Sequence, residues 1–188
     1  VAASFGGNVK LEGASSIGGV GDITLSGNLS GGAALTKVGS GNLILTGVSN
    51  DVSTISVSAG KLQVGDGGTS GKLGTGKVTL TNGTDLVFKR TDTYGSAAIS
   101  NLIEGGGNLT LEAGNLTLAG ANTYTGTTLI KTGATLKVGD NLALGASIGD
   151  TTVDSGGVLD LNGKTVAEPL NLNGTGSANG GALINSNT

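Results

Sequence analysis

The sequence has no cysteine, histidine, methionine or tryptophan, and only one proline, two phenylalanines and two tyrosines in 188 residues. Without cysteine there are no disulfides or thiolate metal sites, and without histidine the usual catalytic triads and zinc sites are excluded. The scarcity of aromatic side chains also excludes an ordinary aromatic-rich core. A buried interior must therefore consist of valine, leucine, isoleucine and alanine.

Charge is also scarce, with ten basic and thirteen acidic residues and a net charge of −3. This excludes the basic surface that nucleic acids require, and it is too weak to keep the chain disordered by self-repulsion. Apolar runs are only a few residues long, whereas a transmembrane helix needs about 20. We expect neither nucleic-acid binding nor membrane insertion by this segment. Any export signal would have to lie outside the sequence, since residues 1–7 have no basic or apolar region typical of one.

Glycine is abundant, with 38 residues, and hydrophobic residues make up 36% of the chain. This composition disfavours helices and suits frequent tight turns. Short apolar pairs with period-two alternation predict strands with one buried face. The pairs are Ile23/Leu25, Leu43/Leu45, Ile55/Val57, Leu62/Val64, Val78/Leu80, Leu109/Leu111, Leu116/Leu118, Leu136/Val138, Leu159/Leu161 and Leu170/Leu172. Gly-, Asn- and Asp-rich clusters between them predict turns.

Much of the sequence is an internal repeat with a period of about 73 residues. Gly41, Asn42 and Leu43 return as Gly114, Asn115 and Leu116, each 73 positions later. Such an internal repeat predicts a repeat architecture. We expect residues 1–188 to form one segment, with two repeats at about 34–106 and 107–180 and partial units at both ends.

Three all-β folds suit short patterned strands: a sandwich, a barrel and a parallel β-helix, or β-solenoid. A sandwich or barrel would favour large core aromatics and hairpin signals, which are missing. A β-solenoid stacks equivalent strands about 4.8 Å apart, so narrow aliphatic rows fill its interior. The Leu-x-Leu or Leu-x-Val anchors lie about 24 residues apart on average. We therefore expect an all-β parallel β-solenoid of about eight coils, roughly 35 to 40 Å long.

Residues 114–139 resemble the autotransporter-associated β-strand repeat, also called the passenger-associated transport repeat. Its pattern is approximately GxLxLxGxNxYxGxTxxxxGxLxV. The matching residues here are Gly114, Leu116, Leu118, Gly120, Asn122, Tyr124, Gly126, Thr128, Gly133, Leu136 and Val138. The earlier copy departs from it, because Ser49, Asp51 and Ser53 stand where the later copy has Asn122, Tyr124 and Gly126.

This resemblance implies a right-handed β-helical stalk in the secreted passenger region of a large bacterial surface protein, exported through an outer-membrane barrel. It implies an extracellular location at the bacterial cell surface and a structural or adhesive role. Its partners would be neighbouring coils of the same long chain, and a glycan or protein receptor. An alternative is a fibre in which like subunits stack end to end through unpaired strand edges. A polysaccharide-active β-helix enzyme is a third hypothesis.

Few residues suggest chemistry. Asp85, Asp154 and Asp160 are candidates for attack on a sugar, but ordinary solvated acids are favoured because aromatic sugar platforms are nearly absent. The stretch GGVGDITLS resembles a calcium-binding nonapeptide, but it places Asp22 one residue early and does not recur in tandem. Residues 71–78 have phosphate-loop spacing but carry Val78 where Ser or Thr must bind magnesium. We expect no catalytic residue, no metal site and no cofactor, and therefore no enzyme.

Two further sets of residues stand out. Residues 87–95 combine the adjacent basic pair Lys89 and Arg90 with Tyr94, which predicts either a protruding partner-contact loop or an ordinary strand with a solvated corner. Asparagines beside glycine predict either stacked amide ladders at corners or residues that tolerate left-handed turns. They are Asn42, Asn82, Asn115 and Asn162.

Overall fold

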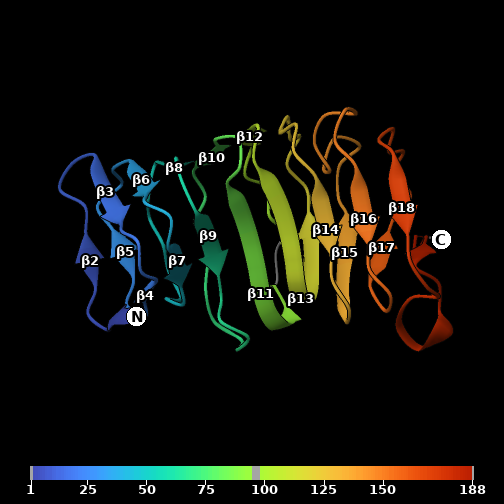
Figure 1. The fold of residues 1–188 in the computed structure, drawn as a ribbon, viewed down its shortest axis with the longest axis horizontal. Helices are drawn as coiled ribbons and strands as arrows, with labels where there is room; N and C mark the ends of the chain where they lie inside the picture. Colours follow the sequence, from blue (N-terminus) through green and yellow to red (C-terminus); the bar gives the residue numbers. More distant parts are fainter. Residues whose placement is uncertain (1, 95–97, 188) are drawn as a thin grey trace.

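The computed structural model describes residues 2–94 and 98–187. It is an all-β parallel β-solenoid of about nine turns. The turns follow one another along the long axis, with the two termini at opposite ends (Figure 1). Every pairing between the described strands is parallel. This confirms the predicted fold class and excludes the hairpin-based sandwich and barrel.

Each turn passes through three positions, which we call side A, side B and side C in chain order. Side A contains β1 (Ala3–Phe5), β4 (Ile23–Leu25), β7 (Asn42–Leu45), β9 (Lys61–Val64), the first part of β11 (Asp85–Thr93) and of β13 (Asn108–Leu118), β14 (Thr128–Ile130), β16 (Thr151–Val153) and β18 (Leu170–Leu172).

Side B carries short strands in the first two turns, an isolated bridge at Asn50 in the third, and strands again from the sixth turn onward. It contains β2 (Val9–Lys10), β5 (Leu29–Ser30), the end of β13, β15 (Ala134–Val138), β17 (Val158–Asp160) and β19 (Leu183–Ile184). Side C contains β3 (Ser15–Gly18), β6 (Leu35–Val38), β8 (Thr54–Val57), β10 (Lys77–Leu80) and β12 (Ile103–Gly105). A short 3-10 helix, η1 (Ser177–Asn179), lies in the last turn.

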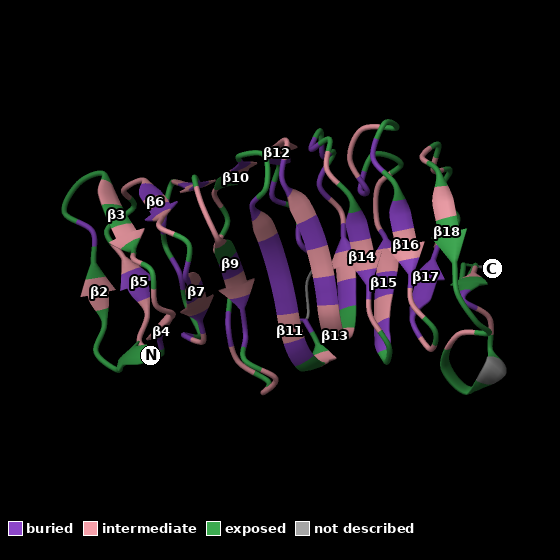
Figure 2. Cartoon of the chain, in the orientation of Figure 1, coloured by how far each residue is buried: buried purple, intermediate pink, exposed green. Residues whose placement is uncertain are grey.

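The core is a set of aliphatic ladders that run through the stack. On side A, Leu43 pairs with Leu62, Leu62 with Leu86 and Leu86 with Leu109, and all four are almost fully buried. Along each strand, the residue between two inward-facing residues points outward. β13 and β15 therefore show alternating bands of buried and partly exposed residues (Figure 2). Like residues therefore stack on like, and neighbouring turns supply most of each turn's contacts.

The number of turns exceeds the predicted eight because the prediction placed anchors of two different ladders in a single ladder, which made each turn seem longer than it is. Leu86 pairs with Leu109, whereas Leu116 lies seven positions later in the same strand, β13, and begins the side B ladder. That second ladder continues through Leu136, Leu159 and Leu183. The 30-residue step from 86 to 116 is thus a full turn plus one side.

The sequence repeat is consequently out of phase with the turns. Leu43 lies on side A of the third turn, and Leu116, 73 positions later, lies on side B of the sixth. Likewise Leu80 ends side C strand β10, and its counterpart Val153 ends side A strand β16. One repeat therefore spans three turns plus one side. The boundaries at residues 34–106 and 107–180 and the right-handed winding stay predictions.

Lys37 is an exception within the apolar core. It faces inward on side C between Ile17 and Val57 and is 0% exposed. Its Nζ donates hydrogen bonds to three backbone carbonyls, those of Val38 (3.0 Å), Gly39 (2.7 Å) and Ala59 (2.9 Å). Burial lowers the pKa of Lys37, although Asp22 opposes this shift. The three carbonyls satisfy the buried ammonium and tie two successive turns together.

Candidate functional site

The repeat signature of residues 114–138 lies on one continuous part of the stack. Its aliphatic members form two rungs of the side B ladder, where Leu116 pairs with Leu136 and Leu118 pairs with Val138. All four side chains are at most 1% exposed. These residues form the interior and present no surface to a partner.

Asn122 connects three successive turns. Its Oδ1 accepts the backbone N–H of Ile103 in the preceding turn (2.9 Å), and its Nδ2 donates to the carbonyl of Ala143 in the following turn (2.6 Å). The side chain is only 1% exposed. Buried amides of this kind are costly to leave unpaired, so Asn122 fixes the spacing and register of its neighbours.

Tyr124 fills the corner that follows Asn122. Its ring is fully buried, and its hydroxyl lies 2.6 Å from Oγ1 of Thr128. Burial raises the pKa of Tyr124 well above its usual value, although the bond to Thr128 opposes the shift. The hydroxyl therefore stays neutral and serves as a buried hydrogen-bonding group at neutral pH.

The signature glycines lie where the backbone is crowded or turns sharply. Gly114 has a φ of 80°, and a Cβ there would also meet the carbonyl of Arg90. A Cβ at Gly126 would collide with the backbone of Gly107 in the preceding turn. Gly133 lies in the turn before β15 with a φ of 77°. The glycines of the signature thus lie where a positive φ or close stacking of turns disfavours any other residue.

The first copy of the repeat also contains an asparagine that bridges three turns, but it lies one position after the place that the pattern predicts. Asn50 accepts the N–H of Leu29 in the preceding turn (3.2 Å) and donates Nδ2 to the carbonyl of Lys72 in the following turn. The pattern-based counterparts Ser49 and Asp51 on either side of it are exposed. The hydrogen-bond map therefore identifies a bridging asparagine that alignment of the two copies missed.

Of the predicted corner asparagines, Asn162 has a φ of 47°, as expected for a left-handed turn. Its Nδ2 also donates to the carbonyl of Val138 in the preceding turn (3.0 Å). Asn42 and Asn115 lie within β7 and β13. The asparagines that bridge both neighbouring turns, Asn50 and Asn122, do not lie beside a glycine.

Two of the three residues of the predicted contact loop are buried. Arg90 is 7% exposed, donates two hydrogen bonds to Asp92 (2.9 and 2.6 Å) and donates a third to the carbonyl of Gly71 (2.8 Å). Its guanidinium lies 4.9 Å from the centre of the Tyr94 ring. The hydrogen bond from Arg90 holds the pKa of Asp92 below its usual value.

Tyr94 completes this packing. Its hydroxyl accepts the N–H of Leu73 (2.8 Å), and its ring meets Phe88 edge-on at 5.3 Å. Burial raises the pKa of Tyr94 to about 12. Only Lys89 is substantially exposed, and it pairs with Glu112 at 3.2 Å. Gly95, the last residue of the predicted loop, lies outside the described residues.

The three acids considered for sugar chemistry do not converge. Asp85 on side A contacts Lys61 (3.4 Å) and accepts Nδ2 of Asn108 (3.1 Å). Asp160, on side B three turns later, is buried and accepts both the N–H and the hydroxyl of Ser186 (2.9 and 2.6 Å). Burial opposes ionisation, but these bonds hold the pKa of Asp160 below its usual value. Asp154 follows β16 and belongs to neither group.

Asp85 and Asp160 are thus occupied by internal contacts, as is Asp22 of the calcium-like stretch, which accepts the N–H of Asn42 (2.8 Å). In residues 2–94 and 98–187 there is no group of three or more acidic side chains placed to hold a metal ion. The same residues contain no helix long and apolar enough to cross a membrane.

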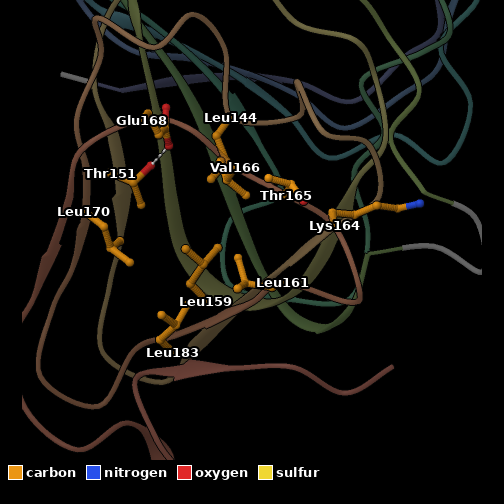
Figure 3. Close-up of a pocket in the computed structure, with 10 residues that line it drawn as sticks. All are labelled: Leu144, Thr151, Leu159, Leu161, Lys164, Thr165, Val166, Glu168, Leu170 and Leu183. Atoms are coloured by element: carbon orange, nitrogen blue, oxygen red, sulfur yellow. Dashed lines mark hydrogen bonds between the residues drawn. The ribbon is translucent and has the colours of Figure 1, made fainter. Parts of the chain in front are cut away.

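Two cavities lie beside residues 164–168, which we call the strap. The terminal cavity has a volume of about 370 Å³. Its lining is Leu144, Thr151, Leu159, Leu161, Lys164, Thr165, Val166, Glu168, Leu170 and Leu183 (Figure 3). The side cavity, about 280 Å³, lies between the strap and residues 141–147. Val166 and Glu168 line both cavities, so the strap is loosely packed on two sides.

Glu168 is the carboxylic acid that lines both cavities. Thr151 Oγ1 donates a hydrogen bond to Glu168 Oε1, whereas Lys164 extends away from the aliphatic side chains (Figure 3). Burial raises the pKa of Glu168 to about 7; the bond from Thr151 opposes this, and the charge of Asp150 adds to it. The carboxyl is therefore close to half-protonated at neutral pH.

In comparisons with known proteins, no family model, no curated protein and no solved structure matched this chain.

Proposed function

We propose that the chain is a structural, adhesive rod segment of an autotransporter-type bacterial protein, located outside the cell. The observation that carries the proposal is the fit between the repeat signature and the stacking of turns. Asn122, Tyr124 and Gly126 each have a contact role between or within successive turns, which is what a long stack of turns needs to keep its spacing. The use of the segment would be mechanical and positional, with no reactive centre and no cofactor.

A display experiment tests this proposal. The segment is fused to an export signal and to the outer-membrane barrel of a characterised autotransporter, and surface exposure is read with an antibody tag and external protease. The wild-type segment should reach the surface and resist protease. A Leu116→Asp variant should be exported but degraded, because it places a charge inside the ladder. Retention of the wild-type segment inside the cell would contradict the proposal.

Adhesion is tested separately at Lys89, the one member of the predicted contact loop whose side chain is partly exposed. Lys89→Ala removes a surface ion pair and should leave the fold intact. If the loop contacts a glycan or protein receptor, binding of displayed cells to that surface should fall. Arg90 and Tyr94 are unsuitable for this assay, because their replacement would disturb internal packing. Unchanged binding of the Lys89→Ala variant would leave the segment as a spacer.

A second candidate function is a fibre in which like subunits stack end to end. In such a fibre, Phe5 in β1 (52% exposed) and Leu172 in β18 (44% exposed) would pack at the junction between subunits. Both face the side A ladder, since Phe5 pairs with Leu25 and Leu172 pairs with Val153. Sedimentation and electron microscopy at rising concentration distinguish long filaments from short rods, and Phe5→Ser should abolish filaments. Assays on acidic and neutral glycans test the remaining enzyme alternative.

A further inference from the structure

A third cavity, which we call the basic pocket, lies at side B in the middle of the stack. Its volume is about 330 Å³, and three successive turns contribute to its walls. The lining residues are Ser49, Asn50, Lys72, Leu73, Gly74, Thr75, Arg90, Tyr94, Ala98 and Ile99. Paired strands precede and follow this level of the stack, so the pocket belongs to the body of the solenoid.

The basic pocket and the side cavity occupy matching places in the two copies of the repeat. Each lies next to the bridging asparagine of its copy, Asn50 or Asn122. Each is also lined by a glycine with positive φ, which is Gly74 (89°) in the first copy and Gly145 (94°) in the second. The side cavity lies three turns and one side further along, which is the offset of the repeat. A hollow at this place is therefore a product of the repeated pattern.

The two hollows differ in charge. Lys72 and Arg90 line the basic pocket, and none of its described lining residues is acidic. Asp92 compensates the charge of Arg90, whereas Lys72 is exposed and forms no ion pair within the described part of the chain. In the side cavity, the charged residue among the described lining is the acid Glu168. The second copy therefore provides a natural comparison of similar position and opposite charge.

The hydrogen-bonding groups of the basic pocket are mostly donors. The Tyr94 hydroxyl accepts the N–H of Leu73 (2.8 Å), and it donates its own proton to no described residue. Arg90 uses three of its five N–H donors on described residues. The ammonium of Lys72 adds three donors. These unused donors, together with the positive charge, suit a negatively charged group that is rich in acceptors.

We propose that the basic pocket binds a small organic carboxylate. The carboxylate contacts Lys72, Arg90 and Tyr94, since charge-assisted hydrogen bonds are the strongest polar contacts available there. The body of the ligand lies against Leu73 and Ile99, two apolar lining residues. The volume of about 330 Å³ falls in the range of roughly 300–1,000 Å³ in which protein pockets hold ligands. This binding activity goes beyond the proposed rod function and does not depend on it.

Titration of three ligands into the whole 188-residue protein tests the chemistry, with amide chemical shifts recorded by NMR. D-glucuronate carries a carboxylate and hydroxyls, cyclohexanecarboxylate lacks the hydroxyls, and D-glucose lacks the carboxylate. The carboxylates should shift the amides of Leu73 and Ile99 with millimolar affinity, and glucose should bind at least tenfold more weakly. Tighter binding of glucuronate assigns a sugar acid, and the reverse order assigns an aliphatic acid. No saturable shift with either carboxylate, or equal binding of glucose, overturns the proposal.

Surface variants locate the site. Lys72→Gln removes the uncompensated charge and Ser49→Trp obstructs the exposed rim, so each should weaken binding at least tenfold, whereas Lys72→Arg should retain it. Lys131→Gln is the matched control, since Lys131 lies outside the pocket and forms no ion pair with a described residue. Thermal unfolding establishes that each variant is folded. Wild-type affinity in both folded pocket variants, or equal ligand-induced shifts at Gly145 in the side cavity, overturns the proposal.

Discussion

The two copies of the repeated pattern, residues 41–66 and 114–140, show the same order of strand, corner and strand on different sides of the solenoid. In the first copy β7 and β9 lie on side A, and Asn50 bridges the turns. In the second copy the end of β13 and β15 lie on side B, and Asn122 bridges the turns. The pattern therefore specifies a local unit that can begin on more than one side of the stack.

The copies differ most at the corner. The second encloses Tyr124 in the interior, whereas its counterpart Asp51 in the first is exposed. The consensus residues thus add a packed corner to a unit that already stacks without them. Stability should accordingly depend on the ladders first, on the bridging asparagines second and on the tyrosine third.

Breaking a ladder should have the largest effect. Leu116→Ala and Leu43→Ala should each lower the free energy of unfolding by about 2 to 5 kcal/mol, because each leaves a cavity in a fully buried row. The outward Thr117→Ala should stay within about 0.5 kcal/mol. Urea unfolding measures the three values, and hydrogen exchange should locate each loss in the turns next to the substitution. Equal costs for Leu116 and Thr117 would contradict the observed facing of β13.

Removing a bridging asparagine should cost somewhat less. Asn122→Ala leaves the N–H of Ile103 and the carbonyl of Ala143 unpaired, which should cost about 2 to 4 kcal/mol. Asn50→Ala should cost less, because Asn50 is 8% exposed and one of its two partners, the carbonyl of Lys72, belongs to an exposed residue. The control is Asn115→Ala, which alters an exposed asparagine in the same turn as Asn122. A negligible effect of Asn122→Ala in urea unfolding would show that the bridges do not hold the turns.

The tyrosine corner should contribute a smaller amount. Tyr124→Phe keeps the ring but leaves the buried hydroxyl of Thr128 without its partner, at a cost of about 1 to 2 kcal/mol. Asp51→Ala, the counterpart in the first copy, should have almost no effect because the side chain is exposed. Thermal unfolding of both variants checks this difference. Equal shifts in the two midpoints would remove the distinction between the corners.

The two halves should also respond differently to pH. Since the pKa of Glu168 is raised to about 7, the folded state keeps a proton that the unfolded state loses near pH 4 to 5. Stability near the strap should fall as pH rises from about 4.5 to 7, by about 1 kcal/mol after allowance for solvent screening. Lys37, whose pKa is lowered, acts in the opposite sense on the alkaline side.

Glu168→Gln is the matched variant for this pH effect, because it keeps the size of the side chain and removes the charge. Thermal unfolding and strap hydrogen exchange at pH 5 and pH 8 should show a difference in the wild type that the variant lacks. An unchanged pH difference in the variant would mean that another group is responsible.

Period-two alternation predicted nine of the described strands, since the apolar pairs from Ile23/Leu25 to Leu170/Leu172 lie in strands with the single exception of Leu161; strands such as β2, β5 and β14 were not predicted. The number of turns was underestimated by about one because side A and side B anchors look alike in sequence, and only pairing separates Leu109 from Leu116. Alternation could also have found Lys37, which shares the phase of Leu35, but charge argues against an inward lysine until its three carbonyl partners are known.

The candidate site was less predictable than the fold. Lys89, Arg90 and Tyr94 form a basic-aromatic group in sequence, yet burial depends on which carbonyls and rings lie in the adjacent turn. The bridging role of Asn50 and Asn122 depends on contacts about 20 residues away in both directions, which no local pattern contains. The raised pKa of Glu168 has no sequence signature either, because it depends on burial beside Thr151 and Asp150.

The offset of one side per repeat has a geometric consequence for longer arrays. If successive repeats kept a length of 73 residues, an outward group at a fixed place in the repeat would advance by one third of the circumference each time. Three repeats would return it to its starting side. A ligand carried at such a place would then be presented on a spiral around the shaft, so neighbouring copies would face different directions and could engage separate surfaces at once.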